Sequence, residues 1–182
     1  MRQPTLHTDR LTLRPFELAD ANKVQSMAGE PCIANASPNI PYPYKPGMAG
    51  LWIGTHSALW QNTKAVHFAV VDRSNYQLTG CVSLQHIESG AAQLGYWIGR
   101  DFWGQGYASE AAKVAIEFGF SQLALDRIYA QHLSKDTQPG KVLKKIGLQF
   151  IEKRKDALRI EHLSQDVEYY QLTSNEYHQV TA

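Results

Sequence analysis

The chain has 182 residues, 43% of them hydrophobic and 19% charged, a composition typical of a soluble globular protein. Its 18 lysines and arginines nearly balance 17 acidic residues, which argues against general nucleic-acid binding, since that usually needs a strong basic bias. Cys32 and Cys81 stand far apart and no histidine pair has metal-ligand spacing, so we expect reduced thiols and no metal site.

The first part of the chain predicts one strand, two helices and a long loop. Residues 11–16 alternate in hydropathy and predict a strand, and Asp20 is an N-cap candidate for a helix over residues 21–28. Residues 31–50 are rich in Pro, Asn, Ser and Gly and predict a long loop, and residues 51–60 predict a helix. Because we find neither a signal peptide nor an apolar run long enough to span a bilayer, we expect a cytoplasmic protein without membrane contact.

The second part predicts five more strands and two helices. Apolar or alternating runs predict strands over residues 66–71, 79–86, 92–98, 127–133 and 166–172. Small residues at helical spacing follow Gly106, and a short helix is expected over residues 136–145, before Gly147. An antiparallel run of strands followed by a strand–helix–strand unit is an α+β layout with one parallel crossover, and we expect a single domain over residues 1–182.

A strand, two glycines and a helix follow one another without a break in residues 95–112, GYWIGRDFWGQGYASEAA. Gly104 and Gly106 let the backbone turn so that successive N–H groups point one way, and the helix N-terminus favours an anion there. A tight strand–helix turn without a ligand is the alternative, and the glycines alone do not separate the two. The patterns of a P-loop and of a dinucleotide fingerprint are not met.

This segment resembles the acetyl-CoA-binding motif of the GNAT superfamily of N-acetyltransferases. It looks most like the Rim-type branch, which acetylates the N-termini of ribosomal proteins, and residues 8–15, 79–84, 142–148 and 166–172 agree with that branch in order and spacing. The resemblance implies a GNAT-like α+β fold with a mixed, mostly antiparallel central sheet of about 6–7 strands, flanked by helices and splayed at the acetyl-CoA site.

The resemblance also implies acetyl-CoA as the cosubstrate. Its pyrophosphate would meet the amides of the glycine turn, and its pantetheine arm would run along one strand edge. The implied cofactor-binding residues are Tyr96, Trp97, Ile98, Trp103, Gly104, Gln105, Gly106, Tyr107, Ala108 and Asp136. The strands that carry Tyr96 and Ile128 would part to take the thioester, the amine would attack it directly, and a backbone N–H near Ile98 would stabilise the oxyanion.

At two positions where that branch usually has a general acid or a general base, this sequence has a different residue. Pro139 stands where a serine-type general acid is usual, and Gln93 stands where a glutamate base is usual. The first candidate catalytic residues that remain are Asp136 and Glu161, and Glu168 and Tyr170 are further substitutes near the end of the chain. Each has a structural alternative, which is a helix N-cap for Asp136 and a solvated or structural strand position for the others.

We therefore expect an acetyl-CoA-dependent N-acetyltransferase that acts on a primary amine. The acceptor is the N-terminus of a (ribosomal) protein or a small amine such as a polyamine. A rival from another class is a GNAT-like acyl-CoA-binding sensor with weakened catalysis, which Gln93 and Pro139 favour. The expected partners are acetyl-CoA and the amine, with no metal, membrane or general nucleic acid, and a homodimer is left open.

Overall fold

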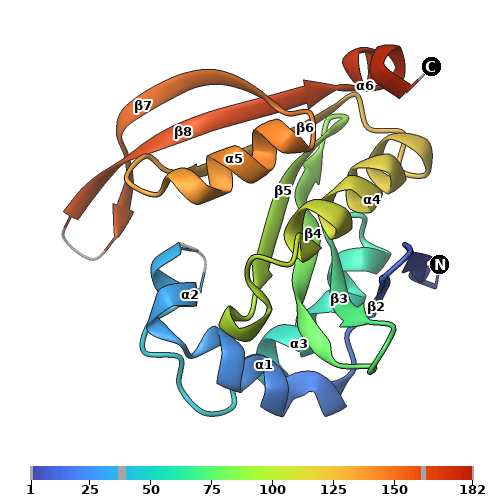
Figure 1. Ribbon diagram of the computed structural model, residues 1–182, viewed down its shortest axis with the longest axis vertical. Helices are drawn as coiled ribbons and strands as arrows, with labels where there is room; N and C mark the ends of the chain where they lie inside the picture. Colours follow the sequence, from blue (N-terminus) through green and yellow to red (C-terminus); the bar gives the residue numbers. More distant parts are fainter. Residues whose placement is uncertain (1, 37–39, 161–162, 182) are drawn as a thin grey trace.

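The computed structural model describes residues 2–36, 40–160 and 163–181 (Figure 1). The strands are β1 (Leu6–His7), β2 (Leu11–Pro15), β3 (Val66–Asp72), β4 (Leu78–Glu88), β5 (Ala91–Ile98), β6 (Arg127–Leu133), β7 (Gln149–Ile160) and β8 (Leu163–Thr173). The helices are α1 (Ala21–Ala28), α2 (Pro31–Ala36), α3 (Met48–Gln61), α4 (Tyr107–Ser121), α5 (Thr137–Lys145) and α6 (Ser174–Thr181), with short 3-10 helices η1 (Leu18–Asp20) and η2 (Arg100–Phe102).

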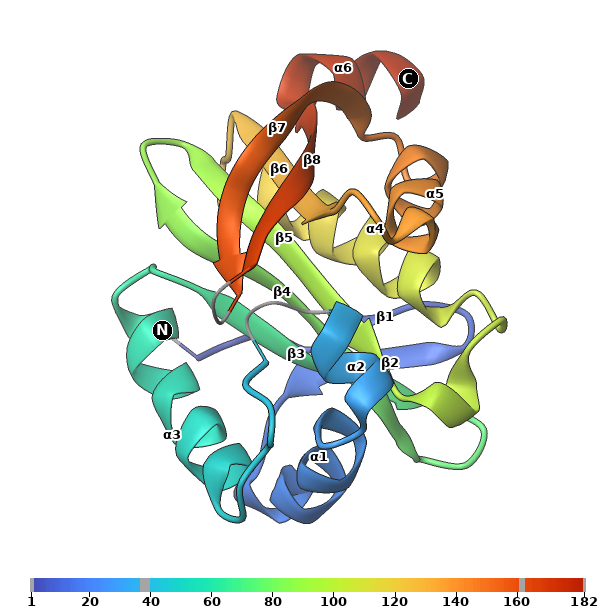
Figure 2. The same ribbon diagram turned by 90° about the vertical axis from the view of Figure 1, so that its left-hand side faces the viewer.

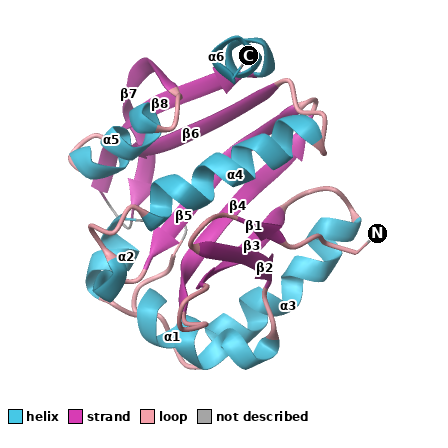
Figure 3. Ribbon diagram, turned by 45° about the vertical axis from the view of Figure 1, so that its right-hand side comes forward, coloured by secondary structure: helices cyan, strands magenta, loops and turns pink. Residues whose placement is uncertain are grey.

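Within the described residues, eight strands form one mixed sheet in the order β1-β2-β3-β4-β5-β6-β8-β7. Every neighbouring pair is antiparallel except β5 and β6, which the helix α4 connects as the expected parallel crossover. In Figure 3 this helix crosses in front of β4 and β5. The α+β fold class expected from the sequence is confirmed, with two strands, β1 and β7, beyond those that were predicted.

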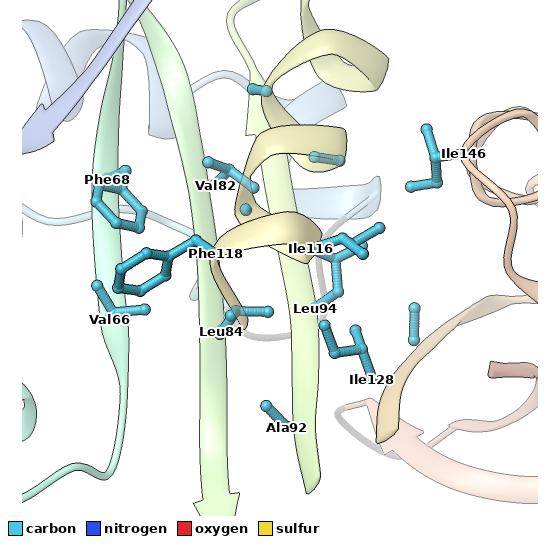
Figure 4. Packing of buried hydrophobic residues seen from close by; sticks show 14 of the residues in the cluster. Val66, Phe68, Val82, Leu84, Ala92, Leu94, Ile116, Phe118, Ile128 and Ile146 are labelled. Atoms are coloured by element: carbon cyan, nitrogen blue, oxygen red, sulfur yellow. The ribbon is translucent and has the colours of Figure 1, made fainter. Parts of the chain in front are cut away.

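Alternate residues of the fully buried strand β3 build the two halves of the core. Phe68 and Val70 belong to the cluster beneath α4, where the rings of Phe68 and Phe118 meet edge to face with centroids 5.7 Å apart (Figure 4). Ala69 and Val71 belong to a second cluster with α1 and α3. Successive strand residues point to opposite faces, so both faces of β3 carry apolar side chains. Helices therefore cover both sides of the sheet.

The strand β7 was not predicted because its sequence, QFIEKRKDALRI, lacks a regular alternation of apolar and polar residues. As the last strand in the order it has one neighbour, β8, and its side chains are mostly exposed, so charged residues are tolerated along its length. In Figure 2, β7 and β8 form a curved two-stranded arm. The two-residue strand β1 and the C-terminal helix α6 were also not predicted.

The loop predicted over residues 31–50 is wrong in part. Helix α2 occupies Pro31–Ala36, and α3 already begins at Met48. Proline is tolerated at the first position of a helix, because the N–H that it lacks would have no partner in the helix there. The Pro-, Asn- and Ser-rich composition therefore hid a helix start, while residues 37–39 lie outside the described part of the chain.

The helix predicted over residues 21–28 is confirmed, but the capping role of Asp20 is wrong. Asp20 already has helical backbone angles because η1 leads directly into α1. Its carboxylate instead accepts hydrogen bonds of 2.7 and 2.8 Å from the Arg14 guanidinium and one of 2.9 Å from the Glu17 N–H. It thereby ties the end of β2 to the start of α1.

Candidate functional site

The strands β5 and β6 separate after a short paired segment. They pair at Ala91↔Arg127, Ala92↔Ile128 and Gln93↔Tyr129, and no pairing follows although the strands continue to Ile98 and Leu133. The separation that the resemblance implied is therefore present. We call the space between the unpaired halves the gap, and the pair Gln93↔Tyr129 its apex.

One edge of the gap is the main chain of β5. Gly99 donates its N–H to the Thr79 carbonyl at 2.8 Å, and the antiparallel register with β4 continues through Ile98 and Tyr96. Because main-chain groups alternate between the two sides of a strand, those of Ile98 and Tyr96 face the gap. The Trp103 indole, half exposed, donates to the Ile98 carbonyl at 2.6 Å. The Ile98 N–H and the main-chain groups of Tyr96 are left to pair with an extended ligand, as one more strand would.

The open end of the gap is formed by the glycine turn and the start of α4. Gly104 and Gly106 have φ angles of 76° and 81°, in the left-handed region that side chains rarely adopt. Gly106 is the N-cap of α4, and Tyr107 and Ala108 follow as its first residues. The first N–H groups of a helix have no partner within it, so this end of α4 is suited to an anion.

Arg10 anchors the turn to the N-terminal part of the chain. Its guanidinium donates to the Gln105 carbonyl at 3.0 Å, pairs with Glu110 at 2.5 Å and lies 4.9 Å from the centre of the Tyr107 ring. Burial raises the pKa of Glu110, but hydrogen bonds from Thr8 and Arg10 lower it more, so it stays below the ordinary value. The turn is held by contacts outside its own segment.

A second anchor connects α4 to β3. The Tyr107 hydroxyl donates to the buried Asp72 carboxylate at 2.6 Å, and Ser74 donates to the same carboxylate through its N–H and hydroxyl at 2.8 and 2.7 Å. The bond from Tyr107 lowers the pKa of Asp72 and raises that of Tyr107. Asp72 is therefore a charged acceptor that depends on these donors.

We expect Tyr107→Phe to lower the free energy of unfolding by about 1–3 kcal/mol, because a buried carboxylate loses a donor. The pKa of Asp72 should rise toward its ordinary value, and CoA affinity should fall several-fold as the first turn of α4 loosens. Urea denaturation and calorimetric CoA titration measure the two effects. Tyr76→Phe, at an 84% exposed tyrosine in the β3–β4 turn, is the matched control and should change neither. Equal stability of the two variants would contradict this role of Tyr107.

The start of α5 forms the other wall of the gap. Asp136 is the N-cap of α5 and accepts a hydrogen bond of 3.3 Å from the Gln138 N–H, as its structural alternative predicted. Pro139 is the third residue of α5, and its carbonyl accepts a hydrogen bond of 3.3 Å from the Tyr96 hydroxyl. Burial, followed by the charge of Asp136, raises the pKa of Tyr96. Tyr96 is therefore a neutral phenol between β5 and α5.

A polar cluster lies beneath α5, in which Glu168 and Tyr170 are candidates from the sequence and His132 is not. His132 Nε2 is buried, lies 3.5 Å from Glu168 Oε2 and has no hydrogen-bond partner among the described residues. The Tyr170 hydroxyl donates to the same Glu168 oxygen at 2.9 Å. A Cβ at Gly140 would lie 2.8 Å from His132 Nε2, so the glycine permits this close approach of α5. The inward position of His132 in β6, two residues after buried Ala130, was the available signal.

Two adjoining cavities lie on the α3 side of the sheet. The first, of about 360 Å³, is lined by Trp52, Thr55, Leu59, Lys64, Ala65, His67, Gln85, His86, Ile87 and Glu88. The second, of about 530 Å³, is lined by His86, Glu88, Ser89, Ala91, Gln93, Arg127, Tyr129, Gln131, Arg154 and Tyr169. They share His86 and Glu88, and the second reaches both residues of the apex. We call the two together the groove.

Two stacked histidines stand at the α3 end of the groove. The rings of His56 and His67 lie 4.2 Å apart and nearly parallel, and Trp52 meets each of them edge to face. Neither ring nitrogen of His56, nor Nδ1 of His67, has a hydrogen-bond partner among the described residues. Burial lowers the pKa of His56 to about 3, with a contribution from His67, and that of His67 to about 4. Both rings are neutral at pH 7.

The residues that the resemblance assigned to acetyl-CoA lie around the gap, with two qualifications. Trp97 belongs to β5, but its side chain packs against the α1 and α3 cluster on the other face. Asp136 stands across the gap from β5, at the start of α5. Glu161 lies outside the described residues. No group of three potential metal ligands occurs in the described part of the chain, and no helix there is long and apolar enough to cross a membrane.

Comparisons with known proteins point to one family. The family model described as an acetyltransferase (GNAT) domain matches residues 10–149. A relative from Bacillus licheniformis, described as an uncharacterized N-acetyltransferase p20, is 30% identical over 175 residues, which are 95% of this chain and 98% of the relative.

Two solved structures have a similar fold at lower identity. The ribosomal-protein-S5-alanine acetyltransferase of Vibrio fischeri has a TM-score of 0.84 at 21% identity, covering 95% of this chain and 98% of its own. The spermidine N-acetyltransferase of Vibrio cholerae in complex with CoA and spermine has a TM-score of 0.80 at 20% identity, covering 93% and 99%. The likeness to both is one of fold, so it does not choose between a protein and a polyamine acceptor.

Proposed function

Because the chain belongs to the GNAT family of acetyltransferases, we propose that it acetylates the N-terminal amine of a protein, in the manner of the Rim-type branch. Transfer of an acetyl group from acetyl-CoA to nitrogen follows from membership of the family. The acceptor and the residues in contact with either substrate are the proposal.

The gap fits acetyl-CoA. Left-handed Gly104 and Gly106 bring the first N–H groups of α4 toward one place, where these groups would hold a pyrophosphate. The edge of β5 from Ile98 to Gln93 spans roughly 17 Å at the rise of an extended strand, which suits an extended arm that pairs with main-chain groups. The thioester would then lie toward the apex.

The chemistry requires few side chains. The neutral amine nitrogen bonds to the thioester carbonyl carbon, and the carbon–sulfur bond breaks with its electron pair left on the CoA sulfur. The amine proton passes to water, and water returns a proton to the thiolate to give free CoA. The N–H groups of Tyr96 and Ile98 face the gap, where they would stabilise the developing oxyanion. Pro139 offers no acidic proton and Gln93 is not a base, so the rate would rest mainly on the positioning of the two substrates.

The observation that carries the choice of acceptor is the groove on the opposite side of the sheet from α4. It meets the gap at the apex and continues past α3, which suits an extended peptide better than a compact amine. Among its described lining residues, Glu88 is the one carboxylate, against the cations Lys64, Arg127 and Arg154. Glu152 already pairs with Arg154, so Lys64 and Arg127 are the cations that would disfavour a polyamine, which carries several positive charges.

The proposal is tested by thiol release from acetyl-CoA with a panel of peptides with free N-termini, the same peptides with blocked N-termini, spermidine and an amino sugar. We expect release with the free peptides and no release with the blocked ones. Calorimetric CoA binding is measured in parallel. Preference for spermidine over every peptide would overturn the protein acceptor, and CoA binding without release on any acceptor would favour the sensor.

A further inference from the structure

We propose that Arg127 binds a carboxylate of the acceptor close to the amine that is acetylated, so that the site prefers acidic acceptors. This inference rests on the proposed function and concerns the same groove. The groove holds three cations, Lys64, Arg127 and Arg154, whose charges are not equally available to a ligand.

The charge of Arg154 is already paired. Its guanidinium contacts Glu152 at 2.6 and 2.7 Å and lies 4.7 Å from the centre of the Tyr169 ring. Tyr169 in turn stacks on Tyr129, with centroids 5.5 Å apart. Arg154 and the two tyrosines therefore form a row of stacked planar groups from the β7–β8 arm to the apex. This row forms a wall of the groove, and its charge is already paired.

Arg127 is exposed and lines the groove, and it makes no ion pair with any described residue. It is close enough to Tyr129 to lower the pKa of that phenol, although burial and Tyr169 raise it more. A guanidinium with five donors and no carboxylate partner is suited to bind one from a ligand.

The position of Arg127 relative to the apex sets the distance at which a carboxylate would be bound. Arg127 precedes Tyr129 by two residues on β6, so its Cα lies roughly 7 Å from the apex, on the side away from the gap. An amine at the apex would thus have its anionic group about one amino-acid residue away. A side-chain carboxylate at the first or second position of a peptide, or the carboxylate of a free amino acid, meets this requirement.

Glu88 is the residue that opposes this preference. Glu88 pairs with Ala91, and Ala91 pairs with Arg127, so the carboxylate and the guanidinium lie in one row across three strands. Two strand spacings place their Cα atoms about 10 Å apart, so the two residues are near each other but separated by one strand. Removal of the Glu88 charge should therefore strengthen the preference for an acidic acceptor.

The experiment compares kcat/KM for thiol release with peptides that differ only in Glu, Gln or Lys at the second position, and with free glutamate. For the wild type we expect the Glu peptide to exceed the Lys peptide by about tenfold or more. Arg127→Gln should remove most of that preference, Arg127→Glu should reverse it, and Glu88→Gln should increase it. CoA affinity should stay unchanged in all three variants. Arg2→Gln, at an exposed arginine before the far-edge strand β1, is the matched control and should keep the wild-type preference.

The two hypotheses fail in different ways. The inference would be overturned if thiol release did not depend on the charge at the second position. It would also be overturned if Arg127→Gln lowered kcat/KM equally for all three peptides. Either result would leave the protein acceptor standing. Release with free glutamate but with no peptide would support Arg127 as a carboxylate-binding residue while it overturns the peptide acceptor. No release with any acceptor, together with CoA binding, would overturn both.

Discussion

The substitution Gly106→Val is expected to weaken CoA binding by about 10- to 100-fold, the loss of one charge-assisted hydrogen bond or more. Gly106 has a φ of 81°, and an added Cβ would lie 3.5 Å from the Arg10 guanidinium, so it is the backbone angle rather than space that excludes valine. A β-branched residue leaves the left-handed region, and the first N–H groups of α4 would then turn away from the pyrophosphate. Calorimetric titration with CoA measures the effect.

Strain of this kind also destabilises the fold, by about 1–3 kcal/mol, and that loss must be separated from the loss of binding. Gly47 offers the matched control, because it is the N-cap of α3 with a φ of 86° and no neighbouring atom within 4 Å of an added Cβ. Gly47→Val should lower stability by a similar amount and leave CoA affinity unchanged. Normal CoA binding by Gly106→Val would contradict the assignment of the glycine turn to a phosphate.

The second large effect is a loss of stability in acid. The unfolded chain binds protons at its histidines near pH 6.5, whereas His56 and His67 have pKa values of about 3 and about 4 in the fold. Between pH 6.5 and those values the unfolded state therefore gains protons that the folded state does not. The stability is fully present above pH 6.5 and falls by about 1.4 kcal/mol per pH unit for each histidine, or roughly 4 kcal/mol in all at pH 5.

Urea denaturation at pH 7.5 and at pH 5 tests this prediction. His56→Phe keeps an aromatic ring in the stack and should halve the difference between the two pH values. His178→Gln, at an exposed histidine of α6, should keep it whole. Ring titration by NMR gives the two pKa values directly. Ring pKa values near 6.5 for both histidines would contradict this prediction. So would an equal loss of stability between pH 7.5 and pH 5 in His56→Phe and the wild type.

Most of the fold could be predicted because local signals agreed with the tertiary structure. The strand over Arg127–Leu133 has the predicted bounds, and so does helix α1. In these segments hydropathy period and burial coincide. The segment Gln149–Ile160 failed for the opposite reason, because an edge strand with exposed side chains carries no such period.

The glycine turn and the groove also differ in how far the sequence could predict them. The left-handed backbone of the glycine turn could be predicted because glycine marks such angles directly in the sequence. The groove could not, because its walls come from strands far apart in the chain. Arg127 and Arg154 meet one cavity only through the pairing of β6, β8 and β7. His132 and Glu168 likewise come together only across β6 and β8.

The partial pairing of β5 and β6 has a consequence for how such an enzyme can diverge. The number of residues that pair between the two strands sets the length of the gap, since each further pair would shorten it by about 3.3 Å. In the proposed binding mode this length would set how far the thioester arm reaches, and it depends on main-chain hydrogen bonds that almost any side chain permits. On that proposal, substitutions on the acceptor side could change the amine that is used while the fit to the same acyl donor is kept.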